Sequence, residues 1–179
     1  VNNVLLYVGQ ITRGKGIDLL LSSLKSVKSD FLLKIVGKGN DENYIKKYIA
    51  GNGMEKKVEF IGFTLDVEKF YSGCSLVIVP SRWQEPFGLI GIEAFSKGKP
   101  VIGFDVGGIS EWLKDGYNGW LIPEGSTFQM TKAIDSALSD RKELEIRGKN
   151  AFLTAKQYSK ADFIKSFEEL LISTGEKNA

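Results

Sequence analysis

The apolar run at residues 76–79, Leu-Val-Ile-Val, constrains the fold of this chain most strongly. It ends at Pro80, and a second apolar segment at 87–95 follows and ends at Gly98 and Pro100. A short apolar run bounded by turn residues is typical of a strand buried on both faces of a sheet, and the second segment predicts a helix. A buried strand followed by a loop and a helix is the repeating unit of an α/β protein.

The same pattern recurs along the chain, with apolar runs separated by glycine-containing loops and helix-like segments. Strands are expected at residues 3–9, 30–37, 57–62, 75–80, 101–104 and 120–123, with helices between them and two more, 144–158 and 159–171, at the end. The predicted fold class is α/β: a Rossmann-like, doubly wound, mostly parallel sheet of about six strands with helices on both faces. Residues 1–179 are expected to form a single domain.

Composition excludes several classes of function. The chain has no histidine and one cysteine, Cys74, which excludes Ser-His-Asp and Cys-His mechanisms and cysteine-rich zinc sites. Its 24 basic and 22 acidic residues give a formal charge of +2, so there is no electrostatic support for nucleic acid binding. No apolar run approaches the length that spans a membrane, and a cytoplasmic location is expected.

Two carboxylates, Glu85 and Glu93, flank the start of the helix that is predicted after the fourth strand. A helix that begins near Phe87 or Gly88 leaves unpaired N–H groups there, and these groups together with the helix dipole attract a phosphate. Carboxylates accept hydrogen bonds from hydroxyl groups, so the pair suits a ligand with both a phosphate and sugar hydroxyls. In the alternative interpretation, both are solvated side chains, and Pro86 opens the helix.

The stretch around these carboxylates also resembles a known family. Residues 80–89, Glu93-Ala94 and residues 98–102 resemble the nucleotide-sugar site of the group-1 family of retaining glycosyltransferases, which have the GT-B fold. The resemblance implies that Glu85 approaches the donor sugar as the catalytic residue and that Glu93 binds the ribose. It also implies that the backbone amides of Gly88 and Leu89, beside Phe87, hold the diphosphate.

The loop after the first strand is a second candidate for phosphate binding. Gly9 to Lys15 matches the first seven positions of a P-loop, but Gly16 stands where a P-loop needs a serine or threonine for magnesium, so an ATPase is not expected. The family resemblance assigns diphosphate contacts to an arginine directly after the strand glycine and to a lysine five residues later. Lys15 fits the second position, whereas Gln10 occupies the first, and Arg13 is a candidate for the missing charge.

Two further loops are expected near the donor. Gly107 and Gly108 resemble the family's glycine pair, which faces the phosphate and sugar, although adjacent glycines also simply make turns. The loop after the third strand would lie near the nucleobase, with Phe63 and Asp66 as its neighbours.

The resemblance as a whole implies the carboxyl-terminal, donor-binding domain of a retaining glycosyltransferase. Such a domain binds a nucleoside diphosphate sugar and supports sugar transfer to an acceptor hydroxyl in polysaccharide or glycolipid biosynthesis. The amino-terminal acceptor domain is expected in a longer parent chain, with peripheral membrane association left open, and the isolated domain is expected to be inactive. No cofactor and no metal are expected, since no Asp-x-Asp sequence occurs. A non-catalytic nucleotide or nucleotide-sugar-binding module is the alternative.

Overall fold

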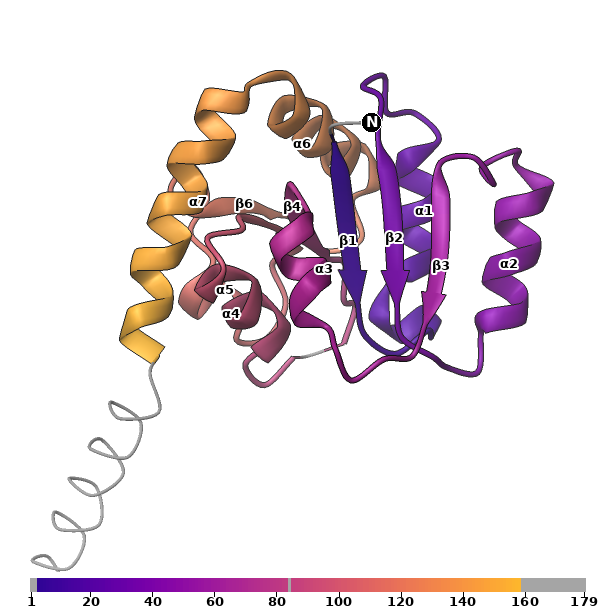
Figure 1. The fold of residues 1–179 in the computed structure, drawn as a ribbon, viewed down its shortest axis with the longest axis horizontal. Coiled ribbons are helices and arrows are strands. Elements are labelled where there is room, and N and C mark those ends of the chain that lie inside the picture. Colours follow the sequence, from indigo (N-terminus) through magenta and orange to yellow (C-terminus); the bar gives the residue numbers. More distant parts are fainter. Residues whose placement is uncertain (1–2, 84, 159–179) are drawn as a thin grey trace, which may run out of the picture.

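The computed structural model describes residues 3–83 and 85–158, and its centre is one six-stranded sheet (Figure 1). The strands lie in the order β3-β2-β1-β4-β5-β6, and each neighbouring pair is parallel. Their bounds are β1 Val4–Val8, β2 Leu32–Val36, β3 Val58–Gly62, β4 Leu76–Val79, β5 Val101–Phe104 and β6 Gly119–Ile122. The apolar strand β4 is buried along its whole length, because the sheet is covered on both faces.

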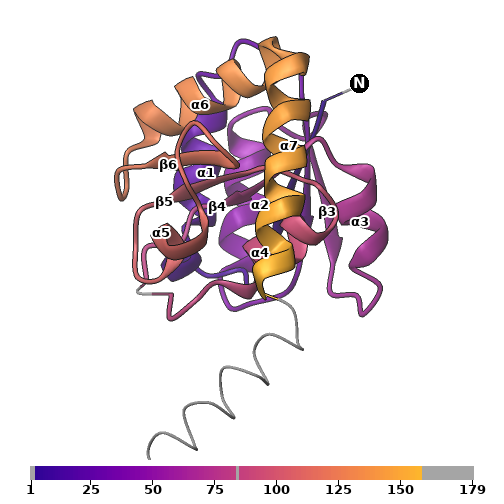
Figure 2. The same cartoon turned by 90° about the vertical axis from the view of Figure 1, so that its left-hand side faces the viewer.

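Helices connect the strands and cover the two faces of the sheet (Figures 1 and 2). Their bounds are α1 Ile17–Leu24, α2 Glu42–Gly51, α3 Glu68–Gly73, α4 Leu89–Ser96, α5 Ile109–Trp112, α6 Thr127–Ser139 and α7 Arg141–Ala155, with short 3-10 helices η1 Arg13–Lys15 and η2 Lys156–Tyr158. Helix α6 packs beside α1 on one face, and α7 packs beside α4 on the other. The predicted Rossmann-like, doubly wound fold is therefore confirmed.

The differences from the predicted elements have local causes. The loop expected after β1 contains the 3-10 helix η1. Strand β6 begins at Gly119, one residue before the predicted start, and ends before Pro123, which lacks the N–H that a strand needs. A Cβ atom at Gly119 would overlap the carbonyl oxygen of Val101 on β5, so only glycine lets the strands pair there. The helix predicted at 159–171 lies outside the described residues.

Strands β1 and β4 are neighbours in the sheet, although α1, β2, α2, β3 and α3 separate them along the chain. The loops that follow them meet at the carboxyl edge, where the direction of winding reverses and where ligands of such sheets bind. Gly16 lies directly against the backbone of Pro80, and a Cβ atom at Gly16 would overlap the Pro80 carbonyl. The serine or threonine that a P-loop needs cannot fit at this position.

Helix α4 is fixed in place by an aromatic side chain from α5. Trp112 is fully buried, and its ring contacts Phe95 edge to face with ring centroids 5.3 Å apart. Gly91 lies against the same indole, where a Cβ atom would overlap the ring. The start of α4 is therefore held by packing between two helices that follow neighbouring strands. None of the helices in the described residues is long and apolar enough to cross a membrane.

Replacing Gly91 by alanine should destabilise the fold by about 1–3 kcal/mol, because the added methyl group forces the buried Trp112 ring to move. Gly51, the last residue of α2, is the matched control, since a Cβ atom there meets nothing within 4 Å. Gly51→Ala should leave stability unchanged or raise it by up to about 1 kcal/mol. Urea unfolding of both variants checks this, and equal midpoints would contradict the packing described for Trp112.

Candidate functional site

A lysine and a glutamate from distant parts of the chain meet at the carboxyl edge of the sheet. The ammonium of Lys15, at the end of η1, pairs with Oε1 of Glu85, in the loop after β4. The hydroxyl of Ser81 donates a hydrogen bond of 2.9 Å to the same carboxylate oxygen. The side chains of Lys15 and Glu85 are only 25% and 15% exposed, so water screens this pair less than a surface pair. Two of the predicted site residues are thus in direct contact.

Two aromatic residues that no sequence pattern indicates lie near this pair. The ring of Trp83 lies against Gly14, and its centroid is 5.9 Å from the Lys15 ammonium. The buried Tyr7 donates a 2.7 Å hydrogen bond from its hydroxyl to the carbonyl of Gln10. Burial raises the pKa of Tyr7, and the negative charge of Glu85 raises it further. Trp83 therefore contacts the loop that carries Lys15, and the charge of Glu85 reaches the buried Tyr7.

Glu93 has a partner that the sequence did not reveal. The hydroxyl of Tyr71, on α3, donates a 2.9 Å hydrogen bond to Oε2 of Glu93 on α4. Burial raises the pKa of Tyr71, and the charge of Glu93 and this hydrogen bond add to the effect. A tyrosine in a short helix resembles a core residue in sequence, and the carboxylate lies 22 positions away, so no local pattern indicates the contact. Tyr71 orients Glu93, which is exposed at the surface of α4.

The amino end of α4 lies open beside Glu85. Gly88 is its N-cap in the left-handed conformation, with φ of 81°, and no side chain of the described residues caps the helix. The Trp112 indole N–H donates to the carbonyl of Phe87 and holds the segment before the helix. The first N–H groups of a helix, here those of Leu89 and Ile90, have no partner within the helix and attract anions, whereas the N–H of Gly91 donates to the carbonyl of Gly88. An ammonium, a carboxylate and a helix start thus meet in one place, an arrangement that suits ligands with an anion and hydroxyl groups.

The glycine pair after β5 packs against this same loop. The N–H of Gly108 donates a 2.7 Å hydrogen bond to the carbonyl of Glu85. Cβ atoms at Gly107 and Gly108 would overlap the backbones of Glu85 and Pro86 respectively. Both glycines therefore allow two loops of the edge to touch backbone to backbone, and this contact fixes the backbone that carries Glu85.

The two predicted cations in the loop after β1, Arg13 and Lys15, point in different directions. Arg13 turns toward α2, where its Nε lies 3.9 Å from Oδ2 of Asp41 and its guanidinium lies 5.7 Å from the centroid of the Tyr44 ring. Lys15 instead pairs with Glu85, in the loop after β4. The structure thus does not bring Arg13 and Lys15 together on one anion, although η1 contains both.

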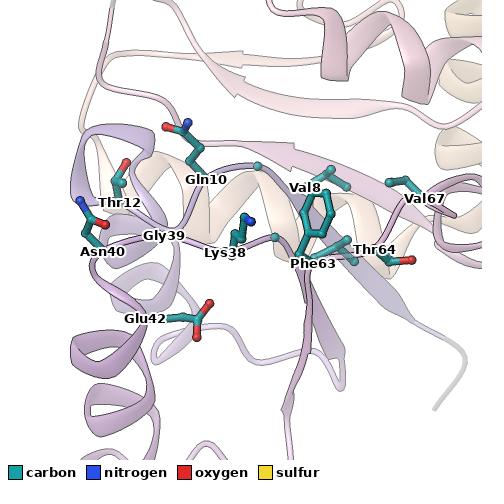
Figure 3. Close-up of a pocket in the computed structure, with 13 residues that line it drawn as sticks. Val8, Gln10, Thr12, Lys38, Gly39, Asn40, Glu42, Phe63, Thr64 and Val67 are labelled. Atoms are coloured by element: carbon teal, nitrogen blue, oxygen red, sulfur yellow. The ribbon is translucent and has the colours of Figure 1, made fainter.

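A pocket of about 720 Å³ opens at the carboxyl ends of β1, β2 and β3 (Figure 3). Of the predicted site residues, Gln10 lines it, and so does Phe63, which the sequence analysis expected near a nucleobase. Phe63 is 61% exposed, so a flat ligand could reach its ring. Among the residues that the structure describes, no group of three or more histidine, cysteine, aspartate or glutamate side chains could hold a metal ion.

The Lys15–Glu85 pair should show strong coupling in a double-mutant cycle of Lys15→Met and Glu85→Gln. Each single change leaves a partly buried charge without its partner, so the double variant should lose about 1–3 kcal/mol less than the sum of the singles. The exposed Lys46–Glu42 pair on α2 is the matched control, with an expected coupling below about 1 kcal/mol. Urea unfolding measures all four corners of each cycle, and additive effects at Lys15 and Glu85 would contradict the pair.

Tyr71→Phe should make stability less sensitive to alkaline pH. The folded chain holds the pKa of Tyr71 above its ordinary value near 10, so the unfolded chain loses this proton first as pH rises. The contribution of the raised Tyr71 pKa to the free energy of unfolding is complete below about pH 10. Above that pH it declines by up to about 1.4 kcal/mol per pH unit. The variant should remove this part of the slope in unfolding experiments between about pH 9.5 and 11.5. Tyr44→Phe, at an exposed site on α2, is the control, and equal slopes for both variants would be evidence against this assignment.

Comparison with known proteins identifies the family. The model of the family described as "Glycosyl transferases group 1" matches residues 2–154. A lipopolysaccharide 1,2-N-acetylglucosaminetransferase of Salmonella typhimurium is 35% identical, over 93% of this chain and 47% of the relative. An uncharacterized glycosyltransferase of Methanocaldococcus jannaschii, MJ1178, is 31% identical, over 86% of this chain and 43% of the relative.

Solved structures agree with this result. Anabaena Alr3699/HepE in complex with UDP has a TM-score of 0.90 at 28% identity, over 96% of this chain and 49% of that protein. A mutant of S. aureus TarM, in a complex that also contains UDP, has a TM-score of 0.89 at 25% identity, over 94% of this chain and 35% of that protein. The chain spans less than half the length of these relatives. This chain belongs to the group 1 family of glycosyltransferases.

Proposed function

We propose that this chain is the donor-binding half of a retaining glycosyltransferase, which binds a nucleoside diphosphate sugar and supports sugar transfer to an acceptor hydroxyl. The observation that carries the proposal is the meeting of Lys15, Glu85 and the open start of α4 at the switch point of the sheet. Two structurally similar proteins, Alr3699/HepE and TarM, were solved with UDP, which supports a nucleoside diphosphate as the ligand here.

The donor would lie across the edge from the start of α4 to the pocket beside Phe63. The amides at Gly88 and Leu89 and the Lys15 ammonium would bind the diphosphate, with Gly107 and Gly108 holding the loop beneath it. Glu93, oriented by Tyr71, would accept hydrogen bonds from the ribose hydroxyls. The base would lie in the same pocket, beside the exposed Phe63.

The chemical step breaks the bond between the anomeric carbon and the diphosphate oxygen and forms a bond from the acceptor oxygen on the same face of the sugar. The diphosphate leaves with the electron pair of the broken bond, and the acceptor hydroxyl would pass its proton to the departing diphosphate oxygen on the same face. Lys15 and the helix start would stabilise the negative charge that develops on the leaving group, in place of a metal ion. Glu85, next to the reacting end, would bind the sugar and stabilise its positive ring.

The Lys15–Glu85 contact would have to change when a diphosphate binds. A diphosphate at the start of α4 would compete with Glu85 for the ammonium, and Glu85 would then be free to accept a hydrogen bond from a sugar hydroxyl. The Ser81 hydroxyl would keep the carboxylate in position during this exchange. The pair thus holds both side chains at the site before the ligand arrives.

The acceptor site would lie in the part of the parent protein that this chain does not cover, since the relatives are about twice as long. The isolated chain would then bind the donor without transferring the sugar. The Salmonella relative acts on lipopolysaccharide by its name, and this supports a role in polysaccharide or glycolipid assembly. The parent protein would work in the cytoplasm, at the inner face of the membrane.

Calorimetric titration of the chain with UDP, GDP and ADP, each with and without magnesium, tests the proposal. We expect at least one of them to bind without the metal, and Glu93→Ala to weaken this binding at least tenfold, because a ribose contact to a charged group is worth about 1.5–3 kcal/mol. Glu145→Ala, on the outer surface of α7, is the control and should bind as the unchanged chain does. Binding that requires magnesium and ATP would contradict the proposal and favour a different nucleotide-binding protein.

A further inference from the structure

Lys38 is a further cation at the proposed donor site, and no sequence motif indicates it. It lies in the turn after β2, and its side chain lines the 720 Å³ pocket together with Gln10 and Phe63. In Figure 3, Lys38 lies between Gln10, which belongs to the loop after β1, and Phe63, which belongs to the loop after β3. Its ammonium lies 4.8 Å from the centroid of the Phe63 ring, a contact that favours this direction of an exposed side chain.

The other charges around this edge already have partners. Arg13 pairs with Asp41, and Lys15 pairs with Glu85. Glu42, the acid that lines the same pocket, pairs with Lys46. Within residues 3–83 and 85–158, Lys38 forms no ion pair. The pocket therefore carries one positive charge that no carboxylate compensates, and this charge favours an anionic ligand.

The backbone that carries Lys38 is held tightly against the neighbouring loops. The N–H of Ile11 donates a 3.0 Å hydrogen bond to the Lys38 carbonyl, and the N–H of Gly37 donates a 2.9 Å hydrogen bond to the carbonyl of Gly62. Cβ atoms at Gly37 and Gly39 would overlap the backbones of Gly9 and Ile11. The turn cannot move away from the pocket without breaking these contacts, so the backbone that carries Lys38 is held at the pocket before a ligand binds.

We propose that Lys38 binds the phosphates of the nucleoside diphosphate and supplies the positive charge that the neutral Gln10 does not. The inference rests on the proposed function and adds a residue to it. Gln10 and Lys38 reach the same pocket from adjacent strands, so a charge on either side chain acts on the same ligand. A lysine that only extends into solvent would not change the affinity for the ligand. A lysine that binds the phosphates would change the affinity for a nucleoside diphosphate but not for the nucleoside.

Lys38→Met tests this by titration with UDP, GDP and ADP and with the matching nucleosides, uridine, guanosine and adenosine. For the diphosphate that binds the unchanged chain most tightly, affinity should fall about tenfold, whereas affinity for its nucleoside should change less than about twofold. The affinity of the variant for the diphosphate should also fall less steeply between about 50 and 300 mM salt. Lys57→Met is the matched control, because Lys57 lies over the Phe31 ring at 5.2 Å at the opposite edge of the sheet.

A second variant tests whether charge is the property that matters. Gln10→Arg in the Lys38→Met background returns a cation to the same pocket and should restore the diphosphate affinity to within about threefold of the unchanged chain. The inference is overturned if Lys38→Met binds the diphosphate as the unchanged chain does, if it loses the nucleoside equally, or if Gln10→Arg fails to restore binding. These results would leave the proposed function intact, whereas an unchanged chain that binds none of the diphosphates would overturn both.

Discussion

The site depends on close contact between the backbones of neighbouring loops at the carboxyl edge of the sheet. Gly16 lies against the carbonyl of Pro80, Gly37 lies against Gly9, and Gly108 lies against Pro86, each with no room for a Cβ atom. These contacts join the loops after β1, β2, β4 and β5 into one layer. Because each loop is held by its neighbours, side chains from distant parts of the sequence reach fixed positions at the edge. Larger side chains at these glycines would separate the loops and the site residues with them.

The Lys15–Glu85 pair is the electrostatic counterpart of this packing. A partly buried ammonium without a carboxylate would be costly to hold at the edge, and so would the carboxylate alone. Paired, the two charges cancel, and the unliganded edge keeps both groups where the proposed reaction needs them. The same cancellation means that Lys15 does not attract a diphosphate at full strength until Glu85 finds another partner. The start of α4 has no such competitor, since no described side chain caps it.

Sequence patterns predicted the strands and the strand–loop–helix setting of the two carboxylates because these depend on local composition. Leu76–Val79 is apolar throughout, and the residues between Glu85 and Glu93 combine turn formers with apolar positions. The contacts within the site depend on how the loops pack and have no local signature. Tyr71 donates to a carboxylate on another helix, and Arg13 turns to Asp41, 28 residues along the chain. The roles assigned to these side chains in ligand binding stay predictions.

Charge balance at the edge explains why Gln10 need not be a defect in the proposed site. Lys15 is paired with Glu85, and Arg13 lies 3.9 Å from the Asp41 carboxylate, so acids offset part of the charge that the loop after β1 would present to a diphosphate. The dipole of α4 contributes only about half a unit charge, from one side. Lys38 approaches from the loop after β2 and forms no ion pair among the described residues, so no directly paired acid offsets its charge at the pocket. A cation in the loop after β2 can attract a phosphate as well as a cation in the loop after β1 would. Electrostatic stabilisation depends on distance and screening rather than on the strand that precedes the charged residue.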